Sequence, residues 1–309
     1  MPTKMFKYCS SLPKSSLASV SDLENKWNYM KSTYVKNYMD GSYLLFSPGI
    51  HKSVSEGQGW LLVMSASMKD KVVFDRAVNY YLRYRDPVSH IMYWRQTEQN
   101  GEIISLDDDK TSATDGDLDL AYGLFLGFDT WKEPRYEELA RQSLNAIKKL
   151  MVHNTYRHFK LGNWALDDSD YGNAARTSDL MFGHIQLFQL VDKSFDWGSV
   201  LATSLKMSQQ LFERNSMNTG LLPDFTRYVN NRWERPTGRV LETEKDPMYN
   251  WNACRNPMRF VAAFCNDGSD FNNLKAQMNT MHSWVKSFAA SPGDIKAVYD
   301  LNGTPLESY

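Results

Sequence analysis

Helical segments of two kinds alternate along the chain, and this alternation limits its possible folds more than any other feature. Residues 134–151 carry apolar or small side chains at helical spacing and charges on the opposite face, as an amphipathic surface helix does. Similar patterns occupy about 70–84, 194–213 and 269–288. Other segments are apolar nearly all round, which is typical of helices enclosed by other helices. These are residues 61–68, 118–128, 178–191 and 256–264.

The alternation predicts an all-α fold. Outer amphipathic helices that return beside inner apolar helices suit a double ring better than a simple bundle. Only the stretches SYLLF near residue 42 and EIISL near residue 102 suggest short strands of hairpins. No linker or change in composition divides the chain, so we expect a single domain over residues 1–309, with 1–20 as an irregular N-terminal segment.

The balance of charge argues against a polyanionic partner. The chain has 35 Lys and Arg against 36 Asp and Glu, for a formal net charge of -1, and phosphate binding needs a basic surplus. No apolar run approaches the roughly 20 residues that span a bilayer. The N-terminus lacks the apolar centre of a signal peptide. We therefore expect neither a nucleic-acid nor a membrane partner, and an export signal is absent from this chain.

Acidic residues stand at the start of apolar helical segments in two places. Glu56 lies in SEGQGW, whose glycines let a ligand or another backbone come close. Asp115, Asp117 and Asp119 lie at the start of the apolar segment 118–128. An acid at a helix N-terminus is ordinary, because it interacts favourably with the helix dipole. Three carboxylates within five residues repel one another, however, so the most buried one should have a raised pKa.

A third cluster combines acids, an amide and an arginine. RVLETEKDPMYNWNACRNPMRFVAAF at 239–264 contains Glu242, Glu244, Asn252 and Arg255. Arg255 is followed four residues later by another arginine, so both share one face if this region is helical. The alternative interpretation is a solvated charged loop followed by a helix with an ordinary basic face.

Other kinds of site find little support in the sequence. The six histidines form no metal-binding motif, the acidic segments lack the spacing of a calcium loop, and neither a nucleophile elbow nor a phosphate-cradling loop is present. We therefore expect no metal and no cofactor. A reaction run by carboxylates alone remains, and the hydrolysis of a glycosidic bond is the common one.

At these stretches the sequence resembles glycoside hydrolase family 8, which comprises inverting endo-glycanases built on an (α/α)6 barrel. SEGQGW resembles the family's S-E-G-x-G-[YW] signature, which places the general acid on Glu56. ATDGDLDLAYGL resembles the segment whose middle Asp holds and distorts the sugar, here Asp117. NTGLLPDF at 218–225 and YNWNACRNPMRF at 249–260 match two further blocks in the same order. The likeness covers about residues 25–305.

The fourth block implies where the catalytic base lies. Cellulase-like members of the family carry a catalytic Asp where this chain has Asn252, and a neutral amide cannot act as a base. In a branch that includes chitosanases and mixed-linkage glucanases, Asn stands there and the base is a Glu ten residues upstream. The resemblance therefore implies Glu242 as the base, with Glu244 as the local competitor.

Two departures from the family pattern bear on these expectations. Leu61 follows the aromatic residue of the first signature, where Gly is usual, and this side chain would reshape the wall beside Glu56. The sequence also stops at YDLNGTPLESY, where the family continues with further helices. The resemblance therefore predicts an (α/α)6 barrel that lacks the C-terminal closing helices.

The resemblance also implies a secreted, monomeric enzyme that cleaves β-1,4 links of a polysaccharide. An acidic cleft that includes residues 107–109, Asp117, Asp167 and Asp168 would attract cationic chitosan, which makes a chitosanase the first expectation. An endo-β-glucanase acting on cellulose or a β-1,3-1,4-glucan is the alternative, and an inactive carbohydrate-binding protein is another. Aromatic rings in loops serve as sugar platforms. The expected substrate-binding residues are Trp94, Trp164, Asp115, Asp167, Tyr249, Asn252 and Arg255, with Asn163 as a further candidate.

Overall fold

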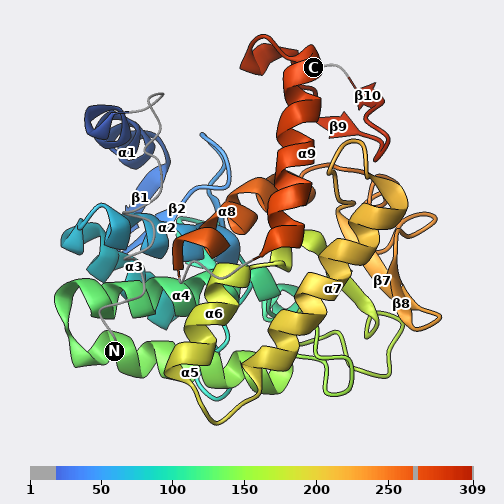
Figure 1. Ribbon diagram of the computed structural model, residues 1–309. Coiled ribbons are helices and arrows are strands. Elements are labelled where there is room, and N and C mark those ends of the chain that lie inside the picture. Colours follow the sequence, from blue (N-terminus) through green and yellow to red (C-terminus); the bar gives the residue numbers. More distant parts are fainter. Residues whose placement is uncertain (1–18, 267–270, 308–309) are drawn as a thin grey trace. The chain divides into compact units, whose positions relative to one another are not determined.

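The structure, a computed structural model, describes residues 19–266 and 271–307; no side chain is described for 265–266 and 307. Within these residues nine α-helices are joined by loops that contain four small sheets. The described chain, whose helices and strands are drawn in Figure 1, falls into two compact units. Unit 1 comprises residues 19–151 and 162–164, and unit 2 comprises 152–161, 165–266 and 271–307.

Unit 1 holds five helices and two small antiparallel sheets. A hairpin pairs β1 with β2, and a three-stranded sheet has the order β3-β4-β5. The elements in chain order are α1 (Val20–Tyr34), β1 (Val35–Tyr38), β2 (Gly41–Leu44), β3 (Lys52–Val54), α2 (Ser55–Ser67), α3 (Lys71–Arg83), β4 (Arg95–Gln99), β5 (Glu102–Ile104), the 3-10 turn η2 (Asp107–Asp109), α4 (Thr114–Trp131) and α5 (Pro134–Leu150).

Unit 2 is built in the same way, from four helices and two small sheets. The three-stranded sheet has the order β6-β7-β8, and β9 pairs with β10. Its elements are β6 (Ala174–Arg176), the 3-10 turn η3 (Thr177–Asp179), α6 (Phe182–Val191), α7 (Trp197–Asn215), β7 (Phe225–Val229), β8 (Arg232–Glu234), the 3-10 turn η4 (Ala253–Arg255), α8 (Asn256–Asn266), α9 (Asn272–Phe288), the 3-10 turn η5 (Pro292–Asp294), β9 (Val298–Tyr299) and β10 (Pro305–Glu307).

Helices α4 and α5 form an antiparallel pair with a very short connection, and they lie side by side in Figure 1. Lys132 ends α4 in the left-handed region with φ of 58°, and its N–H donates to the Phe128 carbonyl. Pro134 is the first residue of α5, where its missing N–H costs nothing. The predicted helix over 134–151 is thereby confirmed to within one residue.

Helix α4 is enclosed, as its apolar sequence predicts. Every residue from Thr114 to Gly127 is buried. It packs against α2 with almost no space between the two backbones, because glycines line the contact. A Cβ added at Gly116 would stand 2.2 Å from the Ser55 hydroxyl, and one at Gly123 would stand 2.7 Å from the Leu62 Cβ. Any larger residue at these positions would push the two helices apart.

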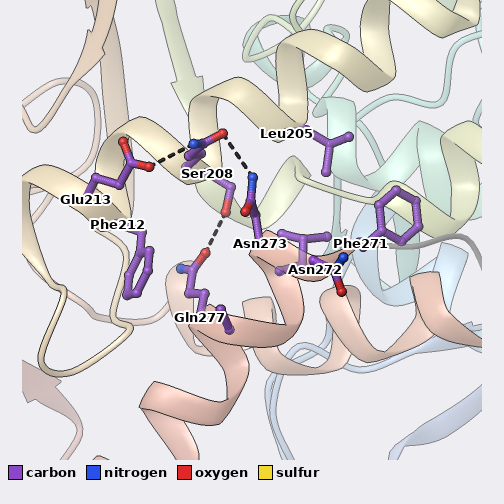
Figure 2. A pocket seen from close by; sticks show the side chains of 11 residues that line it. Leu205, Ser208, Phe212, Glu213, Phe271, Asn272, Asn273 and Gln277 are labelled. Carbon is purple, nitrogen blue, oxygen red and sulfur yellow. Dashed lines mark hydrogen bonds between the residues drawn. The ribbon is translucent and has the colours of Figure 1, made fainter.

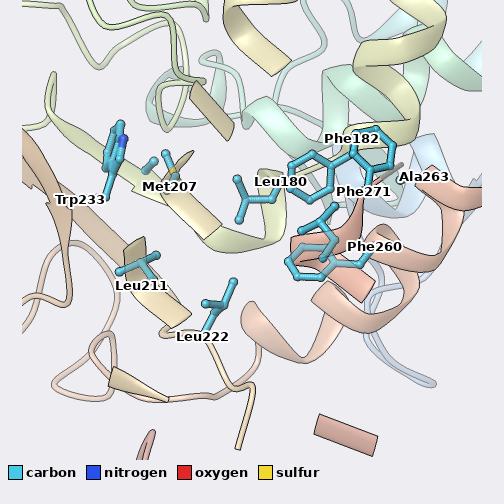
Figure 3. Packing of buried hydrophobic residues seen from close by; sticks show 11 residues of the cluster. Leu180, Phe182, Met207, Leu211, Leu222, Trp233, Phe260, Ala263 and Phe271 are labelled. Carbon is cyan, nitrogen blue, oxygen red and sulfur yellow. The ribbon is translucent and has the colours of Figure 1, made fainter. Parts of the chain in front are cut away.

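The core of unit 2 is aromatic (Figure 3). Phe182 at the start of α6 packs on Phe260 of α8, with ring centroids 5.2 Å apart, and Phe271 joins them. Trp233 of β8 and Leu211 of α7 belong to the same buried cluster. Burial of one such side chain contributes about 1.5–3 kcal/mol, so this cluster accounts for a large part of the stability of unit 2.

The structure confirms the helical patterns and qualifies the expected N-terminal segment. The segments near 70–84, 194–213 and 269–288 correspond to α3, α7 and α9, and the two expected strand pieces are β2 and β5. Of the segment 1–20, residues 1–18 lie outside the described residues, and Val20 already begins α1. The double ring and the single domain stay predictions. In the described part of the chain, no helix is long and apolar enough to cross a membrane.

Candidate active site

Glu56 stands on the first turn of α2, directly after strand β3. The Ser55 N–H donates to the Trp94 carbonyl at 2.9 Å, which fixes the point where the strand becomes a helix. The Glu56 side chain is partly exposed, and its Oε2 lies 3.4 Å from the Ser55 hydroxyl, which donates to it. The backbone around the acid is therefore held on one side by the loop that carries Trp94 and on the other by α4.

The three aspartates at the start of α4 are all buried, each only 1% exposed. Asp115 Oδ1 accepts from the Gly116 N–H at 3.1 Å. Asp119 Oδ2 accepts from Trp60 Nε1 at 2.9 Å, which ties this acid to α2. Asp117 Oδ1 accepts from the Met92 N–H at 3.0 Å. Each carboxylate thus meets a different neighbour, although all three come from one helix.

Among the three aspartates at the start of α4, Asp117 has a pKa that is clearly shifted from its usual value. Burial raises the pKa of Asp117 well above its usual range, and the nearby charges of Asp115 and Glu56 raise it further. The N–H of Met92 acts in the opposite direction but does not offset the burial. The raised pKa agrees with the expectation for this group of carboxylates, and burial is its main cause. Asp117 Oδ2 has no hydrogen-bond partner among the described residues.

The loop beside Glu56 pairs its acids with basic side chains. Arg95 donates from Nη2 to Asp109 Oδ1 at 2.9 Å, and Asp109 is buried. The Arg95 guanidinium also lies over the Trp94 ring, 4.6 Å from its centroid. Asp107 pairs with Lys110 at 2.7 Å on the surface. Much of the acidic run 107–109 is therefore neutralised locally, and one face of Trp94 is covered by a cation.

In unit 2, the loop that carries Glu242 is held by a single carboxylate. Asp246 is buried and accepts from four successive backbone N–H groups. Its Oδ2 accepts from Val240 at 2.8 Å, from Leu241 at 2.8 Å and from Glu242 at 3.0 Å, and its Oδ1 accepts from Thr243 at 2.9 Å. Such a nest of N–H groups around one carboxylate fixes the backbone of the loop.

The Glu242 carboxylate is held at both of its oxygens, although its side chain is 41% exposed. Arg176 donates to Oε1 from Nη2 at 3.2 Å and from Nε at 3.3 Å. Asn252 donates to Oε2 from Nδ2 at 3.0 Å. The two partners orient the carboxylate while leaving it open to solvent.

Asp224, in the segment just before β7, organises the turn that carries Asn252. Its Oδ1 accepts from the N–H groups of Asn250 at 3.1 Å, Asn252 at 3.1 Å and Ala253 at 2.7 Å. Its Oδ2 lies 3.4 Å from Asn252 Nδ2. Burial raises the pKa of Asp224 to about 7, and the charge of Glu242 contributes to this rise, although the three N–H groups act against it.

Other predicted residues lie elsewhere in the two units. Trp164, in unit 1, is partly exposed, and the neighbouring Asn163 is tied to Ser112 by hydrogen bonds in both directions. Tyr249, in unit 2, packs against a buried cluster that includes Tyr299, and the backbones of these two residues pair. The Tyr249 side chain therefore makes structural contacts, and the roles of Trp164 and Tyr249 toward a sugar stay predictions.

Asp167 belongs to a network of unit 2 with Asn154 and Lys160. Its Oδ1 accepts from Lys160 Nζ at 2.9 Å, and its Oδ2 accepts from the backbone and side chain of Asn154. Although partial burial acts to raise it, these hydrogen bonds and the Lys160 charge lower the pKa of Asp167 to about 2. Asp168, the next residue, is exposed.

Two residues near the predicted base take more peripheral positions. Glu244 is exposed, with Oε2 3.8 Å from a Cβ placed on Gly238. Arg255 ends the 3-10 turn η4, and its N–H donates to the Asn252 carbonyl at 3.1 Å. Of the two competing glutamates, Glu242 is the one that contacts Asn252.

Sequence reasoning missed Arg176, Asp224 and Asp246. Asp224 lies in the quoted block NTGLLPDF, yet nothing in the sequence shows that a residue 28 positions upstream contacts Asn252. Arg176 is 66 positions from Glu242. Asp246 was open to detection, because an acid in EKDP four residues after a candidate base is placed to accept N–H groups from that loop.

Two further findings concern ligands. Among residues 19–266 and 271–307, no three or more His, Cys, Asp or Glu side chains gather so as to hold a metal ion. A pocket of about 190 Å³ in unit 2 lies between α7 and α9 (Figure 2). Its polar lining is already bonded internally, with Ser208 donating to Gln277 and Gln209 donating to Glu213. The predicted site residues do not line this pocket.

Comparisons with known proteins agree with the motifs. The family profile described as glycosyl hydrolases family 8 matches residues 1–266. A β-glucanase of Niallia circulans is 30% identical over 294 residues, which cover 92% of this chain and 70% of that protein. An endoglucanase of Bacillus sp. strain KSM-330 is 25% identical over 307 residues, and the chain spans 64% of its length. The apo structure of a β-1,3-1,4-glucanase from Paenibacillus sp. X4 matches with a TM-score of 0.87 and 29% identity, covering 96% of this chain and 80% of that one.

Proposed function

The chain belongs to glycosyl hydrolases family 8 and is an endo-acting glycoside hydrolase, and from this premise we propose that it cleaves a neutral β-glucan, with a β-1,3-1,4-linked glucan as its preferred substrate. Two of the relatives that it resembles carry the names β-glucanase and β-1,3-1,4-glucanase. Because such polymers are too large to enter a cell, we place the activity outside the cell. We propose a monomer on an (α/α)6 barrel.

In the proposed mechanism Glu56 is the general acid and Glu242 is the general base. Glu56 gives its proton to the glycosidic oxygen, while Glu242 takes a proton from the water that attacks the anomeric carbon from the opposite face. The bond from the anomeric carbon to the leaving oxygen breaks as the bond to water forms, so the configuration inverts. An inverting pair needs carboxyl groups about 6.5–9.5 Å apart, which leaves space for the water.

The contact between Asn252 and Glu242 is the observation that carries this assignment of the base. The amide is neutral and accepts no proton from water at neutral pH, whereas Glu242 next to it is a partly exposed carboxylate with a fixed orientation. Glu244 lacks this contact, and its carboxylate lies beside Gly238. The position that holds an Asp base in cellulase-like members is thus occupied by a donor to the proposed base.

Asp117 has a separate role in this proposal. Burial raises the pKa of Asp117 well above its usual range, so it holds a proton more tightly than an ordinary aspartate, and a protonated carboxyl is a hydrogen-bond donor. We propose that Asp117, together with Asp115, binds and distorts the sugar at the cleavage point. Trp94 and Trp164 are the proposed stacking platforms, with Asp167, Tyr249 and Arg255 as further contacts to the polymer.

The charges near these residues support a neutral glucan over chitosan. Chitosan would be attracted by unpaired carboxylates. Asp109 is paired with Arg95, Asp107 with Lys110 and Asp167 with Lys160. Burial raises the pKa of Asp117 well above its usual range, which disfavours its charged form. Most of the acids expected to form the acidic cleft are therefore paired or less readily ionised, which weakens the reason to prefer a cationic substrate.

The test is the release of reducing ends from barley β-glucan, carboxymethyl cellulose and chitosan by the purified protein. We expect the highest kcat/KM on the mixed-linkage glucan, and NMR should show the α-anomer as the first product from a β-link. Faster release from chitosan would replace the proposed substrate, and a β-anomer product would reject the inverting scheme. Glu56→Gln and Glu242→Gln should each lose at least about a hundredfold in kcat, whereas Glu244→Gln serves as the matched control.

A further inference from the structure

We propose that Asp224 and Asn252 form a positioning pair for Glu242: Asp224 fixes the turn at 250–253, and the Asn252 side chain transmits that position to the proposed base. This inference rests on the proposed function, because it takes Glu242 as the base. Neither residue is assigned a proton transfer. Their task is to hold the Glu242 carboxylate at the angle at which it meets the attacking water.

The first step of the argument is the backbone of the turn. Asp224 is 1% exposed, and one of its oxygens accepts from the N–H groups of Asn250, Asn252 and Ala253. A carboxylate that gathers three N–H groups fixes their relative orientation. The Cα of Asn252, and with it the origin of its side chain, is therefore set by Asp224.

The second step is the amide of Asn252, which is buried between two carboxylates. Its nitrogen lies 3.0 Å from Glu242 Oε2 and 3.4 Å from Asp224 Oδ2. A side-chain amide has two N–H donors on one nitrogen, so it can serve both acceptors at once. The amide thus connects Asp224 to Glu242, with the shorter and stronger of the two bonds made to the proposed base.

The third step is the opposite side of the Glu242 carboxylate. Arg176 donates twice to Oε1, while Asn252 donates to Oε2. Two separate donors, one on each oxygen, define the plane of the carboxylate. A carboxylate has about four lone-pair sites, so the remaining sites stay available for a water.

The same geometry explains why an amide suits position 252. With an aspartate there, three carboxylates would meet at Asp224, position 252 and Glu242, and like charges at this distance raise one another's pKa. The amide replaces this repulsion with two attractive contacts. Asn252 therefore adds no third charge between Asp224 and Glu242, and its amide donates to both carboxylates.

The experiment is a double-mutant cycle with an added nucleophile. Azide attacks the anomeric carbon in place of water and has no proton to lose, so it bypasses the base. The new C–N bond forms as the C–O bond breaks, and the leaving oxygen takes its proton from Glu56. Sodium azide should therefore restore glucan cleavage to Glu242→Ala, with a glycosyl azide of inverted configuration as the product.

In the otherwise unchanged enzyme, Asp224→Asn and Asn252→Ala should each lower kcat about ten- to a hundredfold with little change in KM, since a displacement of about 1 Å costs on the order of a hundredfold. In the Glu242→Ala background with azide, the same substitutions should change the rate less than about twofold. A loss that persists undiminished in that background would overturn the proposal, because the residues would then act on the fold or on the sugar directly.

The variants are chosen so that each failure has one meaning. Asn252→Ala keeps Asp224 and its bonds to the backbone of the turn, so it tests the proposal even if Asp224→Asn does not fold. Asp196→Asn is the matched control: Asp196 also accepts a backbone N–H, from Ser199 at 3.0 Å, but it caps α7, and we expect no change in kcat. If Glu242→Gln kept full turnover and azide had no effect, the proposed base itself would be wrong, and the positioning role would fall with it.

Discussion

Gly59 of α2 and Asp119 of α4 touch so closely that a Cβ added at Gly59 would stand 2.5 Å from the Asp119 Cβ. Real Cβ atoms do not approach to this distance, so position 59 admits glycine alone without a shift of one helix. Glu56 and Trp60 are carried on the same turns of α2. The geometry of the proposed acid therefore depends on a backbone contact three residues away.

We predict that Gly59→Ala destabilises the protein by about 1–2 kcal/mol, because the cost of overpacking exceeds the gain in helix propensity. Urea unfolding followed by tryptophan fluorescence measures this change. Gly57→Ala is the matched control on the same helix, since its nearest neighbour, a Leu44 methyl group, would lie 3.5 Å away. We expect Gly57→Ala to be neutral or stabilising, and equal losses at both positions would contradict the role of the close contact.

The buried Asp117 predicts a stability that falls as pH rises. Its pKa in the folded state is raised above the ordinary value of 3.8, so the native state binds the proton more tightly than the unfolded chain does. This contribution is complete below about pH 4 and is lost as pH rises toward the folded pKa. Asp117→Asn removes the titration, and its stability relative to the wild type should increase from pH 4 to pH 8 in urea unfolding. A difference independent of pH would show that Asp117 is ionised in the native state.

Asp167 predicts the opposite dependence. Its pKa is lowered to about 2, so its contribution is complete above about pH 4 and is lost as pH falls toward 2. Asp167→Asn should therefore lower the free energy of unfolding by about 2 kcal/mol at pH 7 and by less at pH 3. The matched control is Asp168→Asn, an exposed neighbour that should change stability by less than about 0.5 kcal/mol. Equal effects of the two substitutions would contradict the network with Lys160.

The proposed neutral substrate predicts an activity that is nearly independent of salt. The kcat/KM on mixed-linkage glucan should change less than about twofold between about 20 and 300 mM NaCl, because screening acts only between charges. Measurements on chitosan in the same buffers provide the comparison. A steep fall with salt on chitosan, together with a higher activity at low salt, would indicate that the acidic residues steer a cationic polymer after all.

The sequence predicts best the helices that have a clear pattern of apolar residues. Residues 134–151 and the enclosed segment 118–128 were identified from side-chain spacing, and they are α5 and part of α4. In these two cases the physical cause lies within one element of the chain. The sequence also predicts a raised pKa for the most buried of Asp115, Asp117 and Asp119, but the main cause of the rise at Asp117 is burial, which depends on how the helices pack.

The parts that the sequence did not predict are contacts between loops. Arg176 reaches Glu242 across 66 positions, and Asp224 reaches Asn252 across 28. Such contacts have no period, and they form only after the helices have packed. The ten-residue spacing between Glu242 and Asn252 did place two residues that touch, while their catalytic roles stay predictions.

Asp246 has a consequence for how this enzyme tolerates change. Since Asp246 holds the backbone of residues 240–243 through four N–H groups, the path of that backbone depends little on the side chain of Leu241. Val240 is buried and the Thr243 hydroxyl accepts from the Lys245 N–H at 3.0 Å, so these two side chains take part in the local structure. Leu241 is therefore the position next to the proposed base where substitution, with Asp246 retained, should preserve the path of the loop.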